Sequence, residues 1–431
     1  MPQPIESSTT GDWASTEKML FRFFFLFFGL FIFPFPIYYL PHADQMLGWY
    51  FDLWNWLIAT TGKRVLHLSK DVSPQGNGSG DTTWNYVQMF IILCAAVLGC
   101  LTWTLLDRNR KDYRRLMYWF TAVVRFYLAF TLIAYGSFKI FKSQFPYPGI
   151  YRLIEPYGES SPMGLAWTFL GYSKAYNYFM GFAEVTGGLL LLFRRTATFG
   201  ALFSMTVTLN IVFINYCFDV PVKIFSSMLF LMAVYTAAPD IYRLWQFFFH
   251  QKESRLKSTG LFFATKWKRV TLLILKTVFI AYLLYTLTSQ AIDGMKTYGD
   301  DAPKSKFYGY YNVDTFIKNR DTIQPLLTDQ IRWNKVVFTE YNGMIVKMMN
   351  DSLIYYASQD DAYEHTLTFT RKGDKGLNQT FHYTITNKYQ IEFKTNDQID
   401  SLYMKLTKID LNKFPLTGRG FHWINEYPFN R

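Results

Sequence analysis

Hydrophobic positions follow two different patterns along the 431 residues. Runs of about 20 apolar residues recur between Leu20 and Ala291, and each is long enough to cross a hydrocarbon layer of about 30 Å. From about residue 293, apolar and polar residues alternate instead. The pattern predicts a membrane helical bundle followed by an all-β domain. The seven predicted helices are 20–40, 86–106, 116–141, 175–193, 197–217, 221–238 and 270–291.

The last third of the chain predicts antiparallel strands that are buried on one face. Leu367 and Phe369 alternate with threonines, and Phe381, Tyr383 and Ile385 alternate with polar residues. Turn residues such as Asn-Gly separate these segments. We expect about seven or eight strands in meander order, forming a closed barrel of lipocalin-like pattern or a sandwich. The predicted strands are 333–340, 343–349, 352–358, 366–370, 381–385, 389–393 and 402–406.

Positive charge lies in the short loops of the helical part. Before residue 295 there are 26 Lys and Arg against 16 Asp and Glu, whereas the remainder has 18 against 16. The basic segments 107–115, 194–195 and 243–269 follow the second, fourth and sixth predicted helices, so all three fall on one side. The positive-inside rule then predicts a cytoplasmic N-terminus and a periplasmic C-terminal domain in a bacterial inner membrane. This distribution indicates topology and argues against a nucleic-acid site.

Four regions follow from these patterns. We expect two helices with a periplasmic loop in 1–115, a four-helix bundle in 116–245, a cytoplasmic loop and seventh helix in 246–294, and the β domain in 295–431. The first apolar run is too long for a signal peptide and is expected to be retained. In the outer loops, 46–58 predicts an interfacial helix, 73–81 a flexible linker and 143–174 an ordered cap.

Cysteine and histidine positions exclude several kinds of chemistry. Cys94, Cys100 and Cys217 form no Cys-x-x-Cys pair, which disfavours a dithiol mechanism. All six histidines fall outside the predicted helices, so haem ligation by helix histidines is excluded, and no zinc-type spacing occurs. We therefore expect neither haem nor metal, and no catalytic motif identifies an enzyme.

Ionisable residues inside two apolar helices mark the candidate site, because an unpaired charge in hydrocarbon costs several kcal/mol. Arg125, Gly136 and Lys139 share one helical stripe, and Glu184 lies between Gly181 and Gly188 on the next helix. At 1.5 Å per residue, Arg125 and Glu184 lie about 12–13 Å from opposite faces. An Arg125–Glu184 ion pair at mid-depth is therefore predicted, either as a ligand or proton site or as a structural pair that fixes helix register.

Other polar residues extend this site toward the outer side. Lys139 and Lys223 fall near the outer boundary, where snorkelling is the simpler interpretation, and Asn210 is expected to form an interhelical hydrogen bond. The predicted ligand-binding set comprises Arg125, Tyr135, Lys139, Glu184, Asn210 and Lys223. The C-terminal segment 416–431 is rich in functional side chains, and we expect it to close the barrel as a plug through Trp423.

The same residues resemble the DoxX family of bacterial membrane proteins. The resemblance rests on Arg125, on Tyr135-Gly-Ser-Phe-Lys139 and on Gly181-x-x-Glu184-Val-Thr-Gly-Gly188, and it covers about 116–245. It implies a four-helix membrane bundle in a family named after subunits associated with thiosulfate:quinone oxidoreductase. The other helices and the β domain are additions to that unit.

These observations lead to three functional hypotheses. The first is a bundle that binds a lipid-soluble or amphipathic molecule, for which a quinone is the example, with the β domain as receiver or cap. The second is a non-catalytic assembly protein that docks a periplasmic or membrane protein partner through the β domain. The third is a small-molecule or lipid transporter, although no inverted repeat or broken helix supports it.

Overall fold

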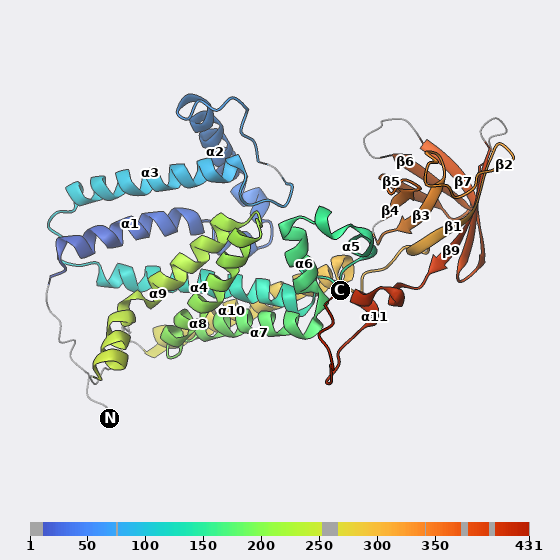
Figure 1. Cartoon of the computed structure of the whole chain (residues 1–431). Coiled ribbons are helices and arrows are strands. Elements are labelled where there is room, and N and C mark those ends of the chain that lie inside the picture. Colours follow the sequence, from blue (N-terminus) through green and yellow to red (C-terminus); the bar gives the residue numbers. More distant parts are fainter. Residues whose placement is uncertain are drawn as a thin grey trace. The chain divides into compact units, whose positions relative to one another are not determined.

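The computed structural model describes residues 12–74, 76–251, 266–340, 342–371, 378–395 and 401–430. It divides into a helical unit, residues 1–143 and 174–294, and a second unit, residues 144–173 and 295–431 (Figure 1). An α-helical bundle followed by an antiparallel β-barrel confirms the predicted fold class. The loop between the third and fourth predicted helices, however, packs with the barrel.

Long helices build the first unit. Within the described residues, six of its helices are long and apolar enough to cross a membrane. The 19-residue α7 is not among those six, because Lys174, Asn177 and Glu184 make it less apolar. It corresponds to one of the seven helices that the sequence predicted. The helices are α1 (Ser15–Ile32), α2 (Ala43–Arg64), α3 (Thr83–Leu106), α4 (Arg114–Ile140), α7 (Lys174–Leu192), α8 (Ala197–Cys217), α9 (Lys223–His250) and α10 (Lys266–Tyr298).

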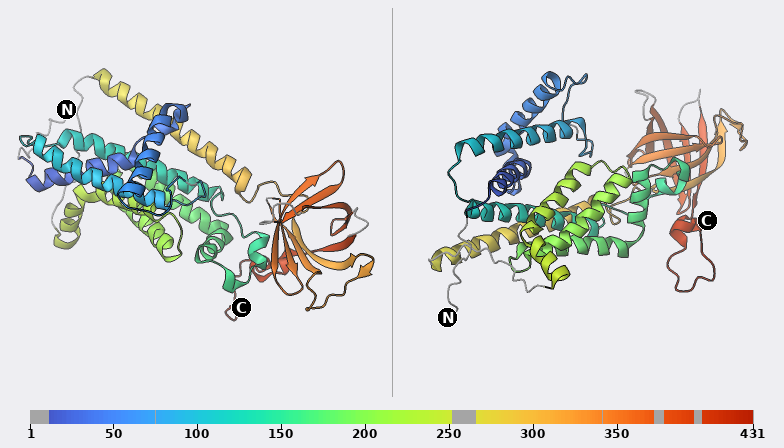
Figure 2. Two further views of the ribbon diagram at one scale, coloured as in Figure 1. Left: turned by 90° about the horizontal axis from the view of Figure 1, so that it is seen from above. Right: turned by 60° about the vertical axis from the view of Figure 1, so that its left-hand side comes forward.

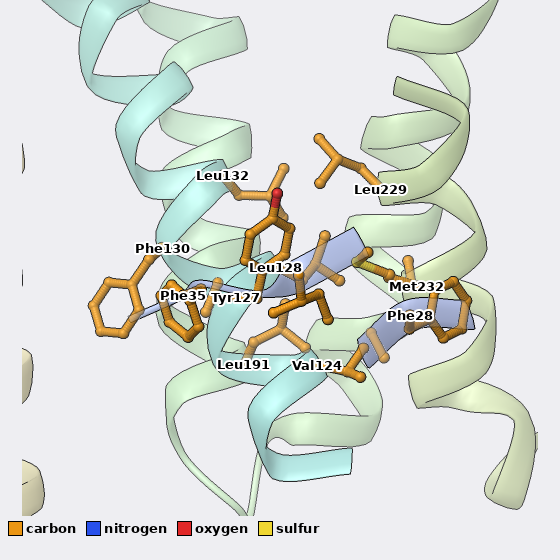
Figure 3. Packing of buried hydrophobic residues seen from close by; sticks show 14 of the residues in the cluster. Phe28, Phe35, Val124, Tyr127, Leu128, Phe130, Leu132, Leu191, Leu229 and Met232 are labelled. Atoms are coloured by element: carbon orange, nitrogen blue, oxygen red, sulfur yellow. The ribbon is translucent and has the colours of Figure 1, made fainter. Parts of the chain in front are cut away.

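Four of these helices form a closed ring of neighbours. α4 packs against α7, α7 against α8, α8 against α9, and α9 back against α4 (Figure 1). The core between them contains Val124 and Leu128 of α4, which lie beside Leu191 of α7, Met232 of α9 and Phe28 of α1 (Figure 3). α1 and α3 pack on each other and α2 packs on α3.

The linker before α3 has a fixed end. Its last residues were expected to be flexible, but the Asp81 carboxylate accepts hydrogen bonds from the backbone N–H groups of Lys223 and Ile224 at 2.7 and 3.0 Å. A carboxylate at the first turn of α9 compensates for N–H groups that have no partner within the helix. The linker therefore joins the α8–α9 hairpin to the start of α3.

Eight strands of the second unit close into an up-and-down barrel (Figure 2). Consecutive strands pair antiparallel, and β1 pairs with β9 to complete the ring, while the two-residue β2 extends β1. The strands are β1 (Gly309–Lys318), β2 (Asp321–Thr322), β3 (Trp333–Phe338), β4 (Gly343–Met348), β5 (Leu353–Asp361), β6 (Thr366–Arg371), β7 (Asn378–Asn387), β8 (Gln390–Thr395) and β9 (Leu402–Ile409).

The barrel interior is filled by side chains. Aromatic rings are in contact inside the barrel: the centroids of Phe369 on β6 and Phe381 on the neighbouring β7 are 5.1 Å apart, and those of Phe307 and Tyr383 are 4.9 Å apart. The guanidinium of Arg332, which is buried, donates to the carbonyl oxygens of Ile323 and Val313 at 2.6 and 2.9 Å. An eight-stranded barrel has an interior of this size, and here it forms a packed core.

The segment 144–173 is ordered and belongs to the barrel unit. It contains α5 (Ile150–Ile154) and α6 (Pro162–Tyr172). Ile150 is buried against the outer barrel face formed by Tyr310, Val337 and Ile345. The backbone at Gly149 passes so close to Glu340 that an added Cβ would lie 2.7 Å from its Oε1 atom. The chain that connects α4 to α7 is therefore held by the barrel.

We expect Phe381→Ala to destabilise the barrel by about 3–5 kcal/mol, because the ring is fully buried among other aromatic side chains. Thermal unfolding of the full-length protein, followed by near-ultraviolet circular dichroism, measures the change. Tyr363→Ala removes a ring that is 97% exposed and should leave the transition within about 0.5 kcal/mol of the wild type. Equal effects of the two substitutions would contradict a packed barrel core.

Candidate functional site

Glycines set the register between the two helices that carry the candidate site. An added Cβ on Gly136 of α4 would lie 2.6 Å from the carbonyl oxygen of Gly181 on α7, and one on Gly188 would lie 2.6 Å from that of Ala129. No larger residue fits these positions without moving a backbone. The antiparallel helices thus meet with residue 136 near 181 and residue 129 near 188, as the small residues on both faces predicted.

This register brings Lys139, and not Arg125, to Glu184. The Nζ atom of Lys139 lies 2.9 Å from Oε2 and 2.8 Å from Oε1 of Glu184. Both residues are buried, with 6% of Lys139 and 2% of Glu184 exposed. Glu184 is the eleventh of the 19 residues of α7, so the ion pair lies near the middle of that helix.

The predicted Arg125–Glu184 pair is wrong. Gly188 of α7 lies against Ala129 of α4. Because the helices are antiparallel, Arg125, four residues before Ala129, lies beside Leu192, four residues after Gly188 and at the C-terminal end of α7. Eight residues separate Glu184 from Leu192, which is about 12 Å along a helix. The sequence argument estimated the depths of Arg125 and Glu184 from opposite membrane faces. Those depths do not define the axial position of α7 relative to α4, which determines this offset.

Tyr135 flanks the ion pair and gives it an exposed side. Its ring centroid lies 5.8 Å from Lys139 Nζ and 5.9 Å from the ring of Phe225 on α9. Tyr135 is 38% exposed although its helix neighbours Ala134 and Gly136 are buried. The pair is thus enclosed by helix backbone on one side and bordered by an accessible aromatic ring on another.

Buried polar residues continue from the ion pair along α4 and α7. Asn177 is fully buried two helical turns before Glu184 on the same face of α7, and Lys142 follows α4 with 5% of its surface exposed. Ser137 is also buried. Asn177 was not predicted, although its position seven residues before Glu184 places it on the same helical stripe. These residues support the predicted polar region toward this end of the helices.

The remaining predicted site residues lie elsewhere. Asn210 is exposed on α8, so the expected interhelical hydrogen bond is not formed there. Lys223 is the first residue of α9. Its Nζ atom lies 2.8 Å from the Asp219 carboxylate, with which it forms an ion pair, and 3.9 Å from the Asp81 carboxylate. The structure thus brings Tyr135, Lys139 and Glu184 together, whereas Arg125, Asn210 and Lys223 form no hydrogen bond or ion pair with Lys139 or Glu184.

Sequence reasoning missed another buried cation, Arg22, which lies in the first half of α1. Arg22 of α1 donates to the Tyr113 hydroxyl at 2.7 and 3.0 Å and to the backbone oxygen of Asp107 at 2.9 Å. Tyr113 in turn donates to the Asp107 carboxylate at 2.7 Å, and this hydrogen bond lowers the pKa of Asp107 below its usual value. The network joins α1 to the loop between α3 and α4, which is a structural role.

The C-terminal segment does not plug the barrel. Trp423 is 91% exposed, and Phe421 and Tyr427 are also largely exposed. Arg419 instead holds the segment by a hydrogen bond to Asn425 at 2.5 Å and by stacking over Phe429. The barrel fills its interior with its own strands, so a terminal plug has no space to occupy.

The described residues contain no group of three or more potential metal ligands. They do include an open pocket of about 310 Å³ near the end of α2, lined by side chains that include Lys63, Arg64 and Lys70. Lys63 and Arg64 lie in the last turn of α2, where cations complement the helix dipole. This pocket is separate from the Lys139–Glu184 pair.

Comparison with known proteins identifies one relative at substantial identity. The uncharacterized protein YwoB of Bacillus subtilis (strain 168) is 40% identical over 136 residues, which are 30% of this chain and 79% of the relative. The chain belongs to the same family as YwoB. No family model matches the chain, and no solved structure matches it. The family relationship therefore brings no activity with it.

We expect Glu184→Gln to destabilise the helical unit by about 3–5 kcal/mol, because it leaves the buried Lys139 ammonium without a counter-charge. Combining it with Lys139→Met should recover most of this loss, since the double variant buries no charge. Unfolding of the purified protein in mild detergent measures both. A double variant as unstable as the sum of the two single variants would show that the residues are not coupled.

Gly181→Ala should weaken packing of α4 on α7, because its Cβ would lie 2.7 Å from a backbone oxygen of α4. We expect a loss of about 1–3 kcal/mol from overpacking. Gly48→Ala on α2 is the matched control, since no atom lies within 4 Å of its added Cβ and alanine favours helix. A neutral Gly181→Ala variant would contradict the close approach of the two helices.

Proposed function

We propose that this is a multi-pass inner-membrane protein whose helical bundle binds an amphipathic, lipid-soluble molecule beside Lys139 and Glu184. The observation that carries the proposal is the buried ion pair next to the accessible ring of Tyr135. Buried charges within membrane helices commonly mark sites of binding or proton transfer. The ring of α4, α7, α8 and α9 agrees with the four-helix bundle implied by the DoxX resemblance.

The chemistry of the pair suits a headgroup that carries oxygen atoms. The Lys139 ammonium can donate to a carbonyl oxygen, and the Glu184 carboxylate can accept from a hydroxyl group. A quinone and its reduced form offer these two groups on one ring, and Tyr135 supplies an aromatic surface beside them. Because the glycine contacts leave no space between α4 and α7, the ligand would approach from the Tyr135 side.

The proposed orientation requires seven membrane-spanning helices, that is, α7 in addition to the six candidate spans. α7 lies antiparallel to both α4 and α8, and its 19 residues extend about 28 Å, which nearly matches the hydrocarbon thickness. With α7 crossing, the basic segments 107–115 and 194–195 and the described part of 243–269 all fall on one side. Residues 252–265 of that last segment lie outside the described residues. The positive-inside rule then supports a periplasmic barrel.

A second candidate function is that of a membrane assembly protein. The packed interior of the barrel favours this function over a role of the barrel in receiving a lipid-soluble ligand. Aromatic side chains occupy the barrel interior, so a lipid-soluble ligand would have to displace its core. The outer surface is a better place for recognition, as α5 already demonstrates by packing there. In this alternative the barrel docks a protein partner, and the ion pair serves only to align α4 with α7.

Native mass spectrometry of the protein purified in mild detergent tests ligand binding. We expect a bound lipid-soluble molecule in the wild type and its loss in the Lys139→Met, Glu184→Gln double variant, which removes both polar contacts without leaving a buried charge. Asn210→Leu is the control, because Asn210 is exposed on α8 and takes no part in the hydrogen bond or ion pair between Lys139 and Glu184. Retention of the same molecule by the double variant would refute the site.

Cysteine labelling in intact bacterial cells tests the orientation. In a background where the three native cysteines are replaced by serine, Tyr363→Cys on the barrel should react with a membrane-impermeant maleimide. Arg110→Cys, in the loop between α3 and α4, should react only after the membrane is permeabilised. The reverse result would place the barrel in the cytoplasm.

A further inference from the structure

Within the described part of the chain, the guanidinium of Arg125 has no carboxylate partner, because Glu184, its predicted partner, is paired with Lys139. Its Nε atom is buried and has no hydrogen-bond partner, and its guanidinium carbon lies 5.6 Å from the ring centroid of Phe126. Among the described residues, no carboxylate forms an ion pair with it. A guanidinium within an apolar helix is costly unless an anion or water compensates it.

A second cation from α10 meets Arg125 at the same ring. The Nζ atom of Lys276 lies 5.3 Å from the Phe126 centroid and donates to the backbone oxygen of Leu192 at 3.1 Å. Arg125 and Lys276 are close enough for their charges to repel each other. Within the part of the chain that the structure describes, Lys276 also lacks a carboxylate partner, so two like charges converge without an acid between them.

The end of α7 completes a cationic cluster. Arg194 follows Leu192 by two residues, its guanidinium lies 5.9 Å from the ring centroid of Tyr118 on α4, and its charge acts on Arg125. Side chains on a helix point toward its N-terminus, so Arg125 extends from its Cα toward Tyr118 and the basic loop. Three cations, from α4, from the turn after α7 and from α10, therefore lie around the point where α7 ends.

We propose that Arg125 and Lys276 bind the phosphate group of an anionic phospholipid. The charge of Arg194 adds to the positive potential there. A phosphate supplies the negative charge that Arg125 and Lys276 lack among the described residues, and Arg and Lys are the side chains that most often bind it. Cationic pockets between membrane helices near the cytoplasmic side recognise such headgroups. The exposed apolar residues of α10, including Leu272 and Leu275, would contact the acyl chains. This proposal does not depend on a ligand at Lys139 and Glu184.

Lipid titration of the purified protein tests the proposal. In detergent, we expect dioleoylphosphatidylglycerol to raise the melting temperature of the wild type more than dioleoylphosphatidylcholine does. Native mass spectrometry should show retained phosphatidylglycerol. Combined Arg125→Gln and Lys276→Gln substitutions should weaken phosphatidylglycerol binding by about tenfold or more, as expected for lost charge-assisted contacts. Inorganic phosphate, tested in parallel, should have little effect because it lacks acyl chains.

Arg115→Gln is the matched control, since Arg115 is an exposed cation on the same helix. It should bind phosphatidylglycerol like the wild type. If the double variant does not fold, Lys276→Gln alone provides the test and should still weaken binding. Equal binding of the two lipids by the wild type, equal loss in Arg115→Gln, or an inorganic phosphate effect as large as that of phosphatidylglycerol would each overturn the proposal.

Discussion

The high cost of placing charge in hydrocarbon, together with the glycine contacts between α4 and α7, determines how the helical unit is organised. Gly136, Gly181 and Gly188 allow the two helix backbones to approach closely in the observed register, which larger residues at these positions would obstruct. That register places Lys139 at Glu184 and leaves Arg125 at the end of α7. The position of each charge thus follows from steric contacts between backbones, and electrostatics then stabilises the arrangement that packing allows.

The same two helices are connected through the barrel unit. Residues 144–173 join the end of α4 to the start of α7, and α5 within this segment is packed on the outer face of β1, β3 and β4. Lys139 lies five residues before this segment begins. The backbone that links α4 to α7 is therefore fixed to the barrel by α5, within the barrel unit itself.

Sequence patterns predicted the elements better than their contacts. The period-two alternation located most strands, but it missed β1, because a bulge between Val313 and Thr315 interrupts the alternation. The apolar runs located every long helix of the first unit except α2, for which the aromatic residues of 46–58 had predicted a separate helix. The polar character of the linker 73–81 suggested flexibility, whereas only tertiary structure shows Asp81 at the first turn of α9. Likewise, helical phase found the faces of α4 and α7 but could not define their relative slide.

The ionisation state of Glu184 in the membrane tests the central claim most directly. Infrared difference spectra between wild type and Glu184→Gln, both reconstituted in lipid bilayers at neutral pH, isolate the absorption of this one carboxyl group. The account predicts an ionised carboxylate band in the wild type, and a shift to the band of a protonated carboxyl group when Lys139→Met removes the counter-charge. A protonated Glu184 in the wild type, or a band that Lys139→Met leaves unchanged, would contradict the Lys139–Glu184 pair.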